Sequence, residues 1–289
     1  MFKLGVMTDE VCQDFEHAVQ VCQEYQLQTV EIRSVWDKPP QQLTDSDVAR
    51  IMRILEPTGM TVSAIASPFY KCDIDDEAAC EEHLRILDRC LEIAQRMGAN
   101  IVRGFTFWNT GHTEEIWGKI LERYEKPVQA AADAGAVLAI ENEASTSVAT
   151  AKLLQRFLAD VNAPHVRAVW DPANEVFADG GERPYPDAFR RIEKQMVHFH
   201  LKDAVRDEES GEPKCVPVGE GVIDWQGQVK ALLASDYDGT VSLETHWRPT
   251  ELTQEQLDRP GGAAFSESGE YASRVCLDNI LRIVKQVAG

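Results

Sequence analysis

Apolar and polar residues alternate along the chain in two distinct patterns. Short runs of β-branched or apolar residues are typical of buried strands, and longer stretches with apolar residues every three or four positions are typical of amphipathic helices. Eight short runs predict strands over 3–7, 29–35, 61–67, 100–107, 136–142, 166–171, 196–202 and 240–245. The stretches between and after them predict helices over 15–25, 45–55, 77–97, 114–134, 148–158, 187–194, 225–233 and 271–287.

This regular alternation predicts an α/β fold with a parallel sheet. Eight strand-helix units close a (β/α)8 barrel, and 289 residues is an ordinary length for one. We therefore predict a single (β/α)8 barrel domain over residues 1–289. Thr44 and Asp224 stand directly before predicted helices and are expected to be N-caps. The polar segment 247–269 is longer than most loops and carries Pro and Gly, so we expect a functional lid or an arm of a homo-oligomer.

Charge and cysteine content narrow the classes of partner and compartment. The chain has 29 Lys+Arg against 48 Asp+Glu, a net charge of −19, which would repel a phosphate backbone, so we expect no nucleic-acid partner. Its 7 cysteines include no close CxxC pair, which argues against a disulfide framework or a cysteine zinc site and favours the reducing cytoplasm. There is no signal-like N-terminal segment and no run of about 18 apolar residues, so neither export nor membrane insertion is expected.

Four residues that can bind a metal stand at the ends of four consecutive predicted strands: Glu141, Asp171, His200 and Glu244. A parallel barrel brings the carboxyl ends of its strands to one rim, so these side chains are expected to meet there. Any one of the carboxylates alone could simply cap the next helix, but four on successive strands favour a shared ion. Three carboxylates and an imidazole suit one divalent ion, Mn²⁺, Mg²⁺ or Co²⁺ with Zn²⁺ possible, and leave room for two substrate oxygens.

The segments around these residues resemble the xylose isomerase-like TIM-barrel superfamily, often described as sugar phosphate isomerases/epimerases. The matching segments are IEN at 140–142, WDPAN at 170–174, HFHLKD at 198–203, GEGVIDW at 219–225 and DGTVSLE at 238–244. The resemblance covers most of the chain, and its specific part is the order Glu, Asp, His, Glu on strands five to eight, as in the ketose 3-epimerases. It implies that Glu141, Asp171, His200 and Glu244 bind one metal ion and that Glu141 and Glu244 exchange protons with the substrate.

The activity implied is that of a divalent-metal-dependent isomerase or epimerase acting on a small polyhydroxylated carbonyl substrate through an enediolate. If the β-hydroxyl leaves instead, the same chemistry gives a dehydratase of the inosose or dehydroshikimate type, and the sequence leaves both outcomes open. A non-catalytic metabolite-binding barrel and an endonuclease IV-like DNA-repair enzyme are further alternatives. The paired glutamates argue against a mere binder. Asn174 stands where the epimerases and these endonucleases have a histidine, and an amide is a poor second zinc ligand but can bind a substrate hydroxyl.

Arg206 and Lys202 are further candidates for substrate binding. Arg206 follows His200 by six residues, where the resemblance places a substrate-binding arginine, although a solvated charge in a loop is the alternative. Lys202 could bind a carboxylate or phosphate, or could instead pair with Asp203 or Glu220.

At the N-terminal strands, Glu31, Arg33 and Arg103 are expected to form an internal ion network, with substrate contact by Arg33 as the alternative. His198 is expected to be a hydrogen-bonded core residue or a support for the metal site. Aromatic residues near predicted strand ends should pack on a sugar or form the pocket wall; these are Trp36, Phe69, Phe107, Trp108 and Trp247.

Overall fold

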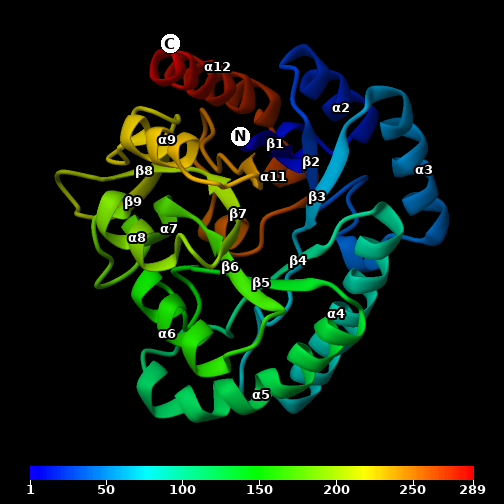
Figure 1. The fold of residues 1–289 in the computed structure, drawn as a ribbon, viewed down its shortest axis with the longest axis vertical. Coiled ribbons are helices and arrows are strands. Elements are labelled where there is room, and N and C mark those ends of the chain that lie inside the picture. The colour runs from blue at the N-terminus through cyan, green and yellow to red at the C-terminus, as the bar shows by residue number, and fades with distance from the viewer.

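The computed structural model describes residues 1–289 and contains a closed barrel of eight parallel strands surrounded by helices (Figure 1). Around the barrel the strands follow the order β1-β10-β7-β6-β5-β4-β3-β2, so neighbours in sequence are neighbours in the sheet. The predicted α/β fold with a (β/α)8 TIM barrel is confirmed. The strands are β1 Lys3–Met7, β2 Thr29–Ile32, β3 Thr61–Ile65, β4 Ile101–Gly104, β5 Val137–Glu141, β6 Val166–Trp170, β7 Met196–Leu201 and β10 Thr240–Leu243.

The predicted helices all form around the barrel, and several short ones lie at strand ends where none was expected. The main helices are α2 Phe15–Glu24, α3 Asp45–Leu55, α4 Glu77–Met97, α5 Thr113–Asp133, α6 Ala151–Val161, α8 Phe189–Ile192, α9 Trp225–Ala234 and α12 Gly269–Ala288. The additional ones are α1 Thr8–Val11, α7 Pro172–Phe177, α10 Gln254–Asp258 and α11 Gly262–Ser266, with the turns η1 Pro40–Gln42, η2 Glu56–Thr58 and η3 Pro184–Ala188. None of the helices combines the length and the apolar composition needed to cross a bilayer.

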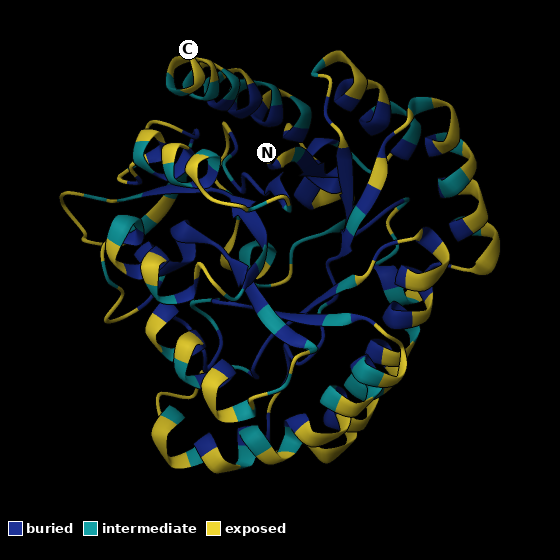
Figure 2. Cartoon of the chain, in the orientation of Figure 1, coloured by how far each residue is buried: buried dark blue, intermediate teal, exposed yellow.

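Local hydrogen bonds explain where the helices start. Thr44 forms a capping box with Asp47, and Asp224 accepts a hydrogen bond from the backbone N–H of Gly227, as predicted for both N-caps. Helix α6 begins three residues later than expected, because Thr150 caps it and the backbone N–H of Val148 donates to Thr106 instead. Burial follows the barrel plan, with the strands and the inner faces of the helices buried and the outer helix faces exposed (Figure 2).

Two segments beyond the barrel strands are more ordered than the sequence suggested. The loop expected after residue 203 is an antiparallel hairpin of β8 Asp203–Arg206 and β9 Pro213–Val216, a pairing that the many charged residues of this segment concealed. The segment 247–269 contains α10 and α11 and is bonded to residues that follow three different strands. Lys71 Nζ donates to the carbonyl of Asp258, and the backbone N–H of Gly262 donates to Ser34. Ser266 donates to the carbonyl of Asp9, so this segment crosses the mouth of the barrel.

Candidate metal and catalytic site

The four predicted metal ligands meet at the carboxyl ends of β5, β6, β7 and β10. Ligand atoms of Glu141, Asp171, His200 and Glu244 all lie within 4.8 Å of one another, and the four residues are buried. Nδ1 of His200 lies 2.9 Å from Oε1 of Glu141 and 3.2 Å from Oε2 of Glu244. The two glutamates therefore approach one point from two different strands. We call these four residues the acidic cluster.

The carboxylate of Asp171 caps helix α7 with one oxygen and directs the other toward the residues of the acidic cluster. Its Oδ1 accepts hydrogen bonds from the backbone N–H groups of Ala173 and Asn174, which begin α7. Oδ2 accepts no hydrogen bond although it is buried, and Lys202 Nζ lies 2.7 Å from it. Asn142 fixes the neighbouring strand end, because its side chain pairs with both the N–H and the C=O of Asp171.

Besides Lys202, two buried arginines contact the acidic cluster. Arg33 Nη1 lies 2.8 Å from Glu244 Oε1, while its other nitrogens bind Asp9 and Glu10 at 2.9 and 2.8 Å. Arg103 Nη1 lies 3.0 Å from Glu141 Oε2 and 3.6 Å from Glu244 Oε1. Arg33 and Arg103 are therefore ion-paired inside the barrel, but with carboxylates of the cluster and of α1 and not with Glu31, so the predicted network among Glu31, Arg33 and Arg103 does not form as expected.

Glu31, the third member predicted for that network, binds histidines instead. Its Oε2 lies 2.8 Å from Nε2 of His198, and its Oε1 lies 3.3 Å from Nε2 of His200. Because β1 and β10 separate β2 from β7 in the strand order, these contacts cross the barrel interior. They show that His198 and His200 both point inward, one layer above the other, and that His198 is a hydrogen-bonded core residue, one of the two roles expected for it.

Burial and the neighbouring charges shift the protonation equilibria of the cluster in different directions. Burial raises the pKa of Asp171 to about 7, despite the opposing effect of Lys202. Burial alone would raise the pKa of Glu244, but Lys202 and His200 hold it well below its usual value. Burial would lower the pKa of His200, but the carboxylates of Glu141, Glu244 and Glu31 hold it well above its usual value. In the absence of another cation, these carboxylates therefore favour the protonated, positively charged form of His200.

The residues present fit a divalent cation in charge as well as in donor type. The connected ion network holds more buried carboxylates than buried Lys and Arg side chains. The carboxylates are Asp9, Glu10, Glu31, Glu141, Asp171 and Glu244, and the cations are Arg33, Arg103, Lys202 and Arg248. The excess of two negative charges is what one divalent ion would neutralise with the histidines uncharged. The donor set of carboxylate oxygens and one imidazole agrees with this fit.

Two of the other residues predicted to bind substrate, Asn174 and Lys202, contact the acidic cluster. Asn174 donates to Glu141 Oε1 at 3.2 Å and to the carbonyl of Asn142 at 2.9 Å. Lys202 pairs with Asp171 and Glu244, so the expected alternative pairing with Asp203 or Glu220 is wrong. Lys202 pairs with these two residues because its side chain points into the barrel.

Asp203 points the other way and organises the loop before α9. Its Oδ2 accepts hydrogen bonds from the N–H groups of Gly219 and Gly221 and from Nε1 of Trp225. Arg206 is not brought to the acidic cluster: it is exposed on β8 and donates to the carbonyls of Val176 and Gly211. The prediction that Arg206 binds substrate therefore has no support in its placement.

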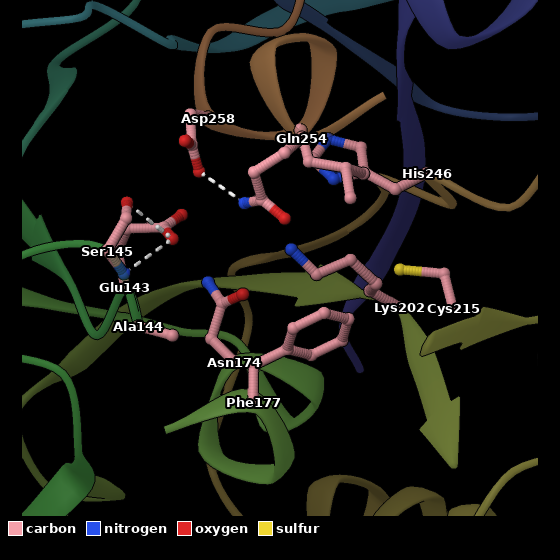
Figure 3. Close-up of a pocket in the computed structure, with 11 residues that line it drawn as sticks. Glu143, Ala144, Ser145, Asn174, Phe177, Lys202, Cys215, His246, Gln254 and Asp258 are labelled. Carbon is pink, nitrogen blue, oxygen red and sulfur yellow. Dashed lines mark hydrogen bonds between the residues drawn. The ribbon is translucent and has the colours of Figure 1, made fainter. Parts of the chain in front are cut away.

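Two cavities open beside the acidic cluster under the segment 247–269. The first, here the Asn174 cavity, has a volume of about 230 Å³, and the side chains of Asn174, Lys202 and Gln254 point into it (Figure 3). The second, here the Arg259 cavity, has a volume of about 490 Å³ and is lined by Arg33 and Arg103 on the side of the cluster. Asp258, the last residue of α10, lines both, so the two cavities adjoin at this end of the helix. The expectation that this segment is functional is consistent with its position.

The aromatic residues expected at the mouth are mostly structural. Phe69 and Phe107 are fully buried and stack on the two sides of Tyr70. Trp36 packs against Phe15 and lies under Arg50, and Trp247 packs against Tyr271. The aromatic ring that lines the Arg259 cavity is that of Phe105, which carries Arg103 and Lys71 on its faces at 4.5 Å.

Several charged residues beside the acidic cluster were not predicted from the sequence. Asp9 and Glu10 lie in α1, just after β1, and bind Arg33, and Glu10 also binds Arg248. His246 lies two residues beyond Glu244, and its Nε2 is 3.1 Å from Arg33 Nη1. A related signal, carboxylates two and three residues after a strand, was present at Asp9 and Glu10.

A model of the family described as "Xylose isomerase-like TIM barrel" matches residues 19–265. The chain belongs to this family. Solved structures with the same fold include D-psicose 3-epimerase with D-tagatose from Clostridium cellulolyticum H10, at 14% identity and a TM-score of 0.73, covering 98% of this chain and 99% of that one. The IOLI protein with a bound zinc atom is 19% identical over 99% of each chain, with a TM-score of 0.71.

A third similar structure is a xylose isomerase-like TIM-barrel protein from Mycobacterium smegmatis in complex with magnesium. It is 18% identical, with a TM-score of 0.64, and covers 92% of this chain and 89% of that one. At these identities the structural likenesses demonstrate the shared fold. What the acidic cluster does in this chain must be argued from its own residues.

Proposed function

We propose that the protein is a divalent-metal-dependent isomerase or epimerase that transfers a proton next to the carbonyl of a small polyhydroxylated substrate. The observation that carries the proposal is the pair Glu141 and Glu244, which converge from β5 and β10 on Nδ1 of His200 within a buried acidic cluster. The family, and the sugar epimerase and the zinc- and magnesium-bound barrels that share its fold, support the same chemistry.

Glu141, Asp171, His200 and Glu244 would hold the ion. A bound divalent cation supplies a Lewis acid that makes the hydrogen next to a carbonyl more acidic, by stabilising the enediolate. Mn²⁺, Mg²⁺ and Co²⁺ suit the three carboxylates and one imidazole best, and Zn²⁺ is also compatible.

Glu244 is suited to take the proton from carbon. Its pKa is held well below the usual range, against the effect of burial, by Lys202 and His200, so it is a charged carboxylate at neutral pH. Glu141, which contacts the same Nδ1 of His200, would return a proton to the opposite face of the same carbon, which inverts that centre. Delivery to the adjacent carbon would give the isomerised sugar.

The neighbouring residues hold the two glutamates in place. Arg103 Nη1 bridges the pair on one side, at 3.0 Å from Glu141 and 3.6 Å from Glu244. Asn174 binds Glu141 Oε1 and also lines the Asn174 cavity, where its amide oxygen can accept a hydrogen bond from a substrate hydroxyl. Lys202 lines the same cavity and can donate to a second substrate oxygen.

Hydrogen exchange tests the proposal directly. The Mn²⁺-loaded protein is incubated in deuterated water with ketoses, hydroxypyruvate and inososes, and proton NMR follows the label at the carbon next to the carbonyl. We expect exchange on at least one substrate and its loss, by 10³-fold or about 4 kcal/mol in barrier, in E141Q and E244Q. E220Q, a change at an exposed glutamate outside the cluster, is the matched control.

The metal content of each variant is measured alongside exchange, so that loss of the ion is separated from loss of the base. Exchange that survives in both E141Q and E244Q would remove these residues from the mechanism. Label incorporation accompanied by loss of a hydroxyl would reassign the reaction to a dehydratase.

A further inference from the structure

We propose that the protein acts on an uncharged disaccharide, whose second ring lies in a cavity beside the hairpin β8–β9. This inference rests on the proposed function and specifies its substrate class. The cavity, here the hairpin cavity, has a volume of about 510 Å³. It is lined by residues of the hairpin on one side and of the first part of segment 247–269 on the other.

The hairpin cavity adjoins the Asn174 cavity next to the acidic cluster. Four residues line both cavities: Phe177, Cys215, His246 and Leu257. Phe177 and Cys215 stand beside the side chain of Lys202, which contacts the acidic cluster (Figure 3). A group attached to a sugar ring in the Asn174 cavity would therefore extend into the hairpin cavity.

The volumes of the two cavities differ in the same sense. Pockets that bind small molecules usually have volumes of about 300–1,000 Å³. The Asn174 cavity, at about 230 Å³, is smaller than this range, whereas the hairpin cavity, at about 510 Å³, lies within it. A substrate larger than one sugar ring would use both.

The wall of the hairpin cavity is rich in apolar side chains that the protein itself does not cover. Six partly exposed apolar residues line it: Phe177, Pro213, Val216, Trp247, Leu252 and Leu257. Apolar residues gathered in this way beside a catalytic site are typical of a ligand-binding groove. The C–H faces of a sugar ring can pack on such a wall while its hydroxyl groups stay at the edge.

The charged groups at the edge of the hairpin cavity favour an uncharged ligand. Glu212 and Glu251 are exposed and form no ion pair, whereas the ammonium of Lys214 is bound by Asp207 at 2.9 Å. Free carboxylates accept hydrogen bonds from hydroxyl groups and repel a phosphate or another carboxylate. A neutral polyhydroxylated ring matches this edge.

Arg248 adds a buried donor without adding free charge. Its Nη2 lies 3.1 Å from Oε2 of Glu10, so its positive charge is already paired. Its Nη1 donates to the carbonyl of Trp247, but its Nε–H is buried and has no hydrogen-bond partner. Arg248 lines the hairpin cavity, and a hydroxyl oxygen of the second ring would supply the missing acceptor.

Titration calorimetry on the Mn²⁺-loaded protein tests the inference with neutral ligands that share one reacting unit. D-fructose is compared with turanose, maltulose, isomaltulose and lactulose, in which the same fructose unit carries a second sugar ring. We expect at least one of these disaccharides to bind about tenfold more tightly than fructose. Proton NMR in deuterated water follows label exchange on the same ligands.

The variant L252W places a larger ring in the hairpin cavity and should reduce the ratio of disaccharide to fructose affinity to below about threefold. V222W is the matched control, because Val222 is exposed and lines neither cavity, so its ratio should stay unchanged. The double variant E212A/E251A, which removes the two free carboxylates, should weaken disaccharide binding as well. E208A, at an exposed glutamate of the same hairpin that lines neither cavity, is its control.

Fructose affinity equal to that of every disaccharide, or equal ratios in L252W and V222W, would overturn the second-ring site. This outcome is separate from failure of the proposed function. If fructose exchanges label and no disaccharide binds more tightly, the proton-transfer chemistry stands and the second-ring site falls. If disaccharides bind in the manner that L252W disrupts but no sugar exchanges label, the second-ring site stands and the proposed reaction falls.

Discussion

Glu31 on β2 lies 3.3 Å from Nε2 of His200 on β7, while the other ring nitrogen of that histidine faces Glu141 and Glu244. The carboxylate therefore orients the imidazole so that Nδ1 points into the acidic cluster. Glu31 also binds His198 at 2.8 Å, which fixes the carboxylate itself. Carboxylates that accept the second N–H of a metal-binding histidine orient the ring and increase its basicity.

From this contact we predict that E31Q weakens metal binding by about 10–100-fold, although all four residues of the acidic cluster are retained. An amide can still bond to one histidine, but it lacks the charge that favours the N–H on Nε2. Calorimetric titration with Mn²⁺ measures the change. E220Q should bind metal like the unmodified protein, and an unchanged affinity in E31Q would show that Glu31 does not support the site.

Metal affinity should rise with pH between 6 and 8. Despite burial, which acts in the opposite direction, Glu141, Glu244 and Glu31 hold the pKa of His200 well above its usual value, and burial raises that of Asp171 to about 7. Both groups therefore bind protons at pH 6 that a cation must displace, and fewer protons remain at pH 8. Titrations in buffers of different ionisation enthalpy measure the protons released. A pH-independent affinity with no proton release would contradict the pKa shifts.

Replacing Lys202 with methionine should tighten metal binding by about tenfold. The ammonium lies 2.7 Å from Asp171 Oδ2 and 3.4 Å from Glu244 Oε2, so its positive charge competes with a cation for the same carboxylates. K202M removes this repulsion and keeps much of the buried volume. The same change should slow deuterium exchange, because the proposed donor to substrate is lost. Weaker metal binding in K202M would show that Lys202 organises the carboxylates more than it competes for them.

Arg33 should be important for stability as well as for the site. Its side chain is 3% exposed and binds Asp9, Glu10 and Glu244, so R33M would leave the buried Asp9 without its cationic partner and would remove one of the partners of Glu10 and of Glu244. We expect a loss of about 3–5 kcal/mol in the free energy of unfolding, measured with urea in the absence of metal. R85M removes an exposed pair with Glu82 and should cost less than about 1 kcal/mol. Similar losses in the two variants would argue against a structural role for Arg33.

Much of the barrel could be predicted because its strands and helices are specified by local patterns. Strand β1 and helices α3 and α4 have the predicted bounds, and Thr44 and Asp224 cap their helices as expected. The hairpin β8–β9 was missed because its pairing depends on the antiparallel register between two charged segments, and neither has a strong apolar alternation. Helix α7 was missed because it is short and its cap, Asp171, was assigned to the metal alone.

The sequence by itself determined the barrel and the four residues of the acidic cluster, because the period of βα units places one side chain per strand end on a common rim. Only the tertiary structure decided the partners of those residues. Glu31 and His198 are 167 positions apart, and Arg33 and Glu244 are 211 apart, so no local pattern relates them. Closure of the barrel brings β2 opposite β7 and near β10, and burial then requires each charge to find a partner there.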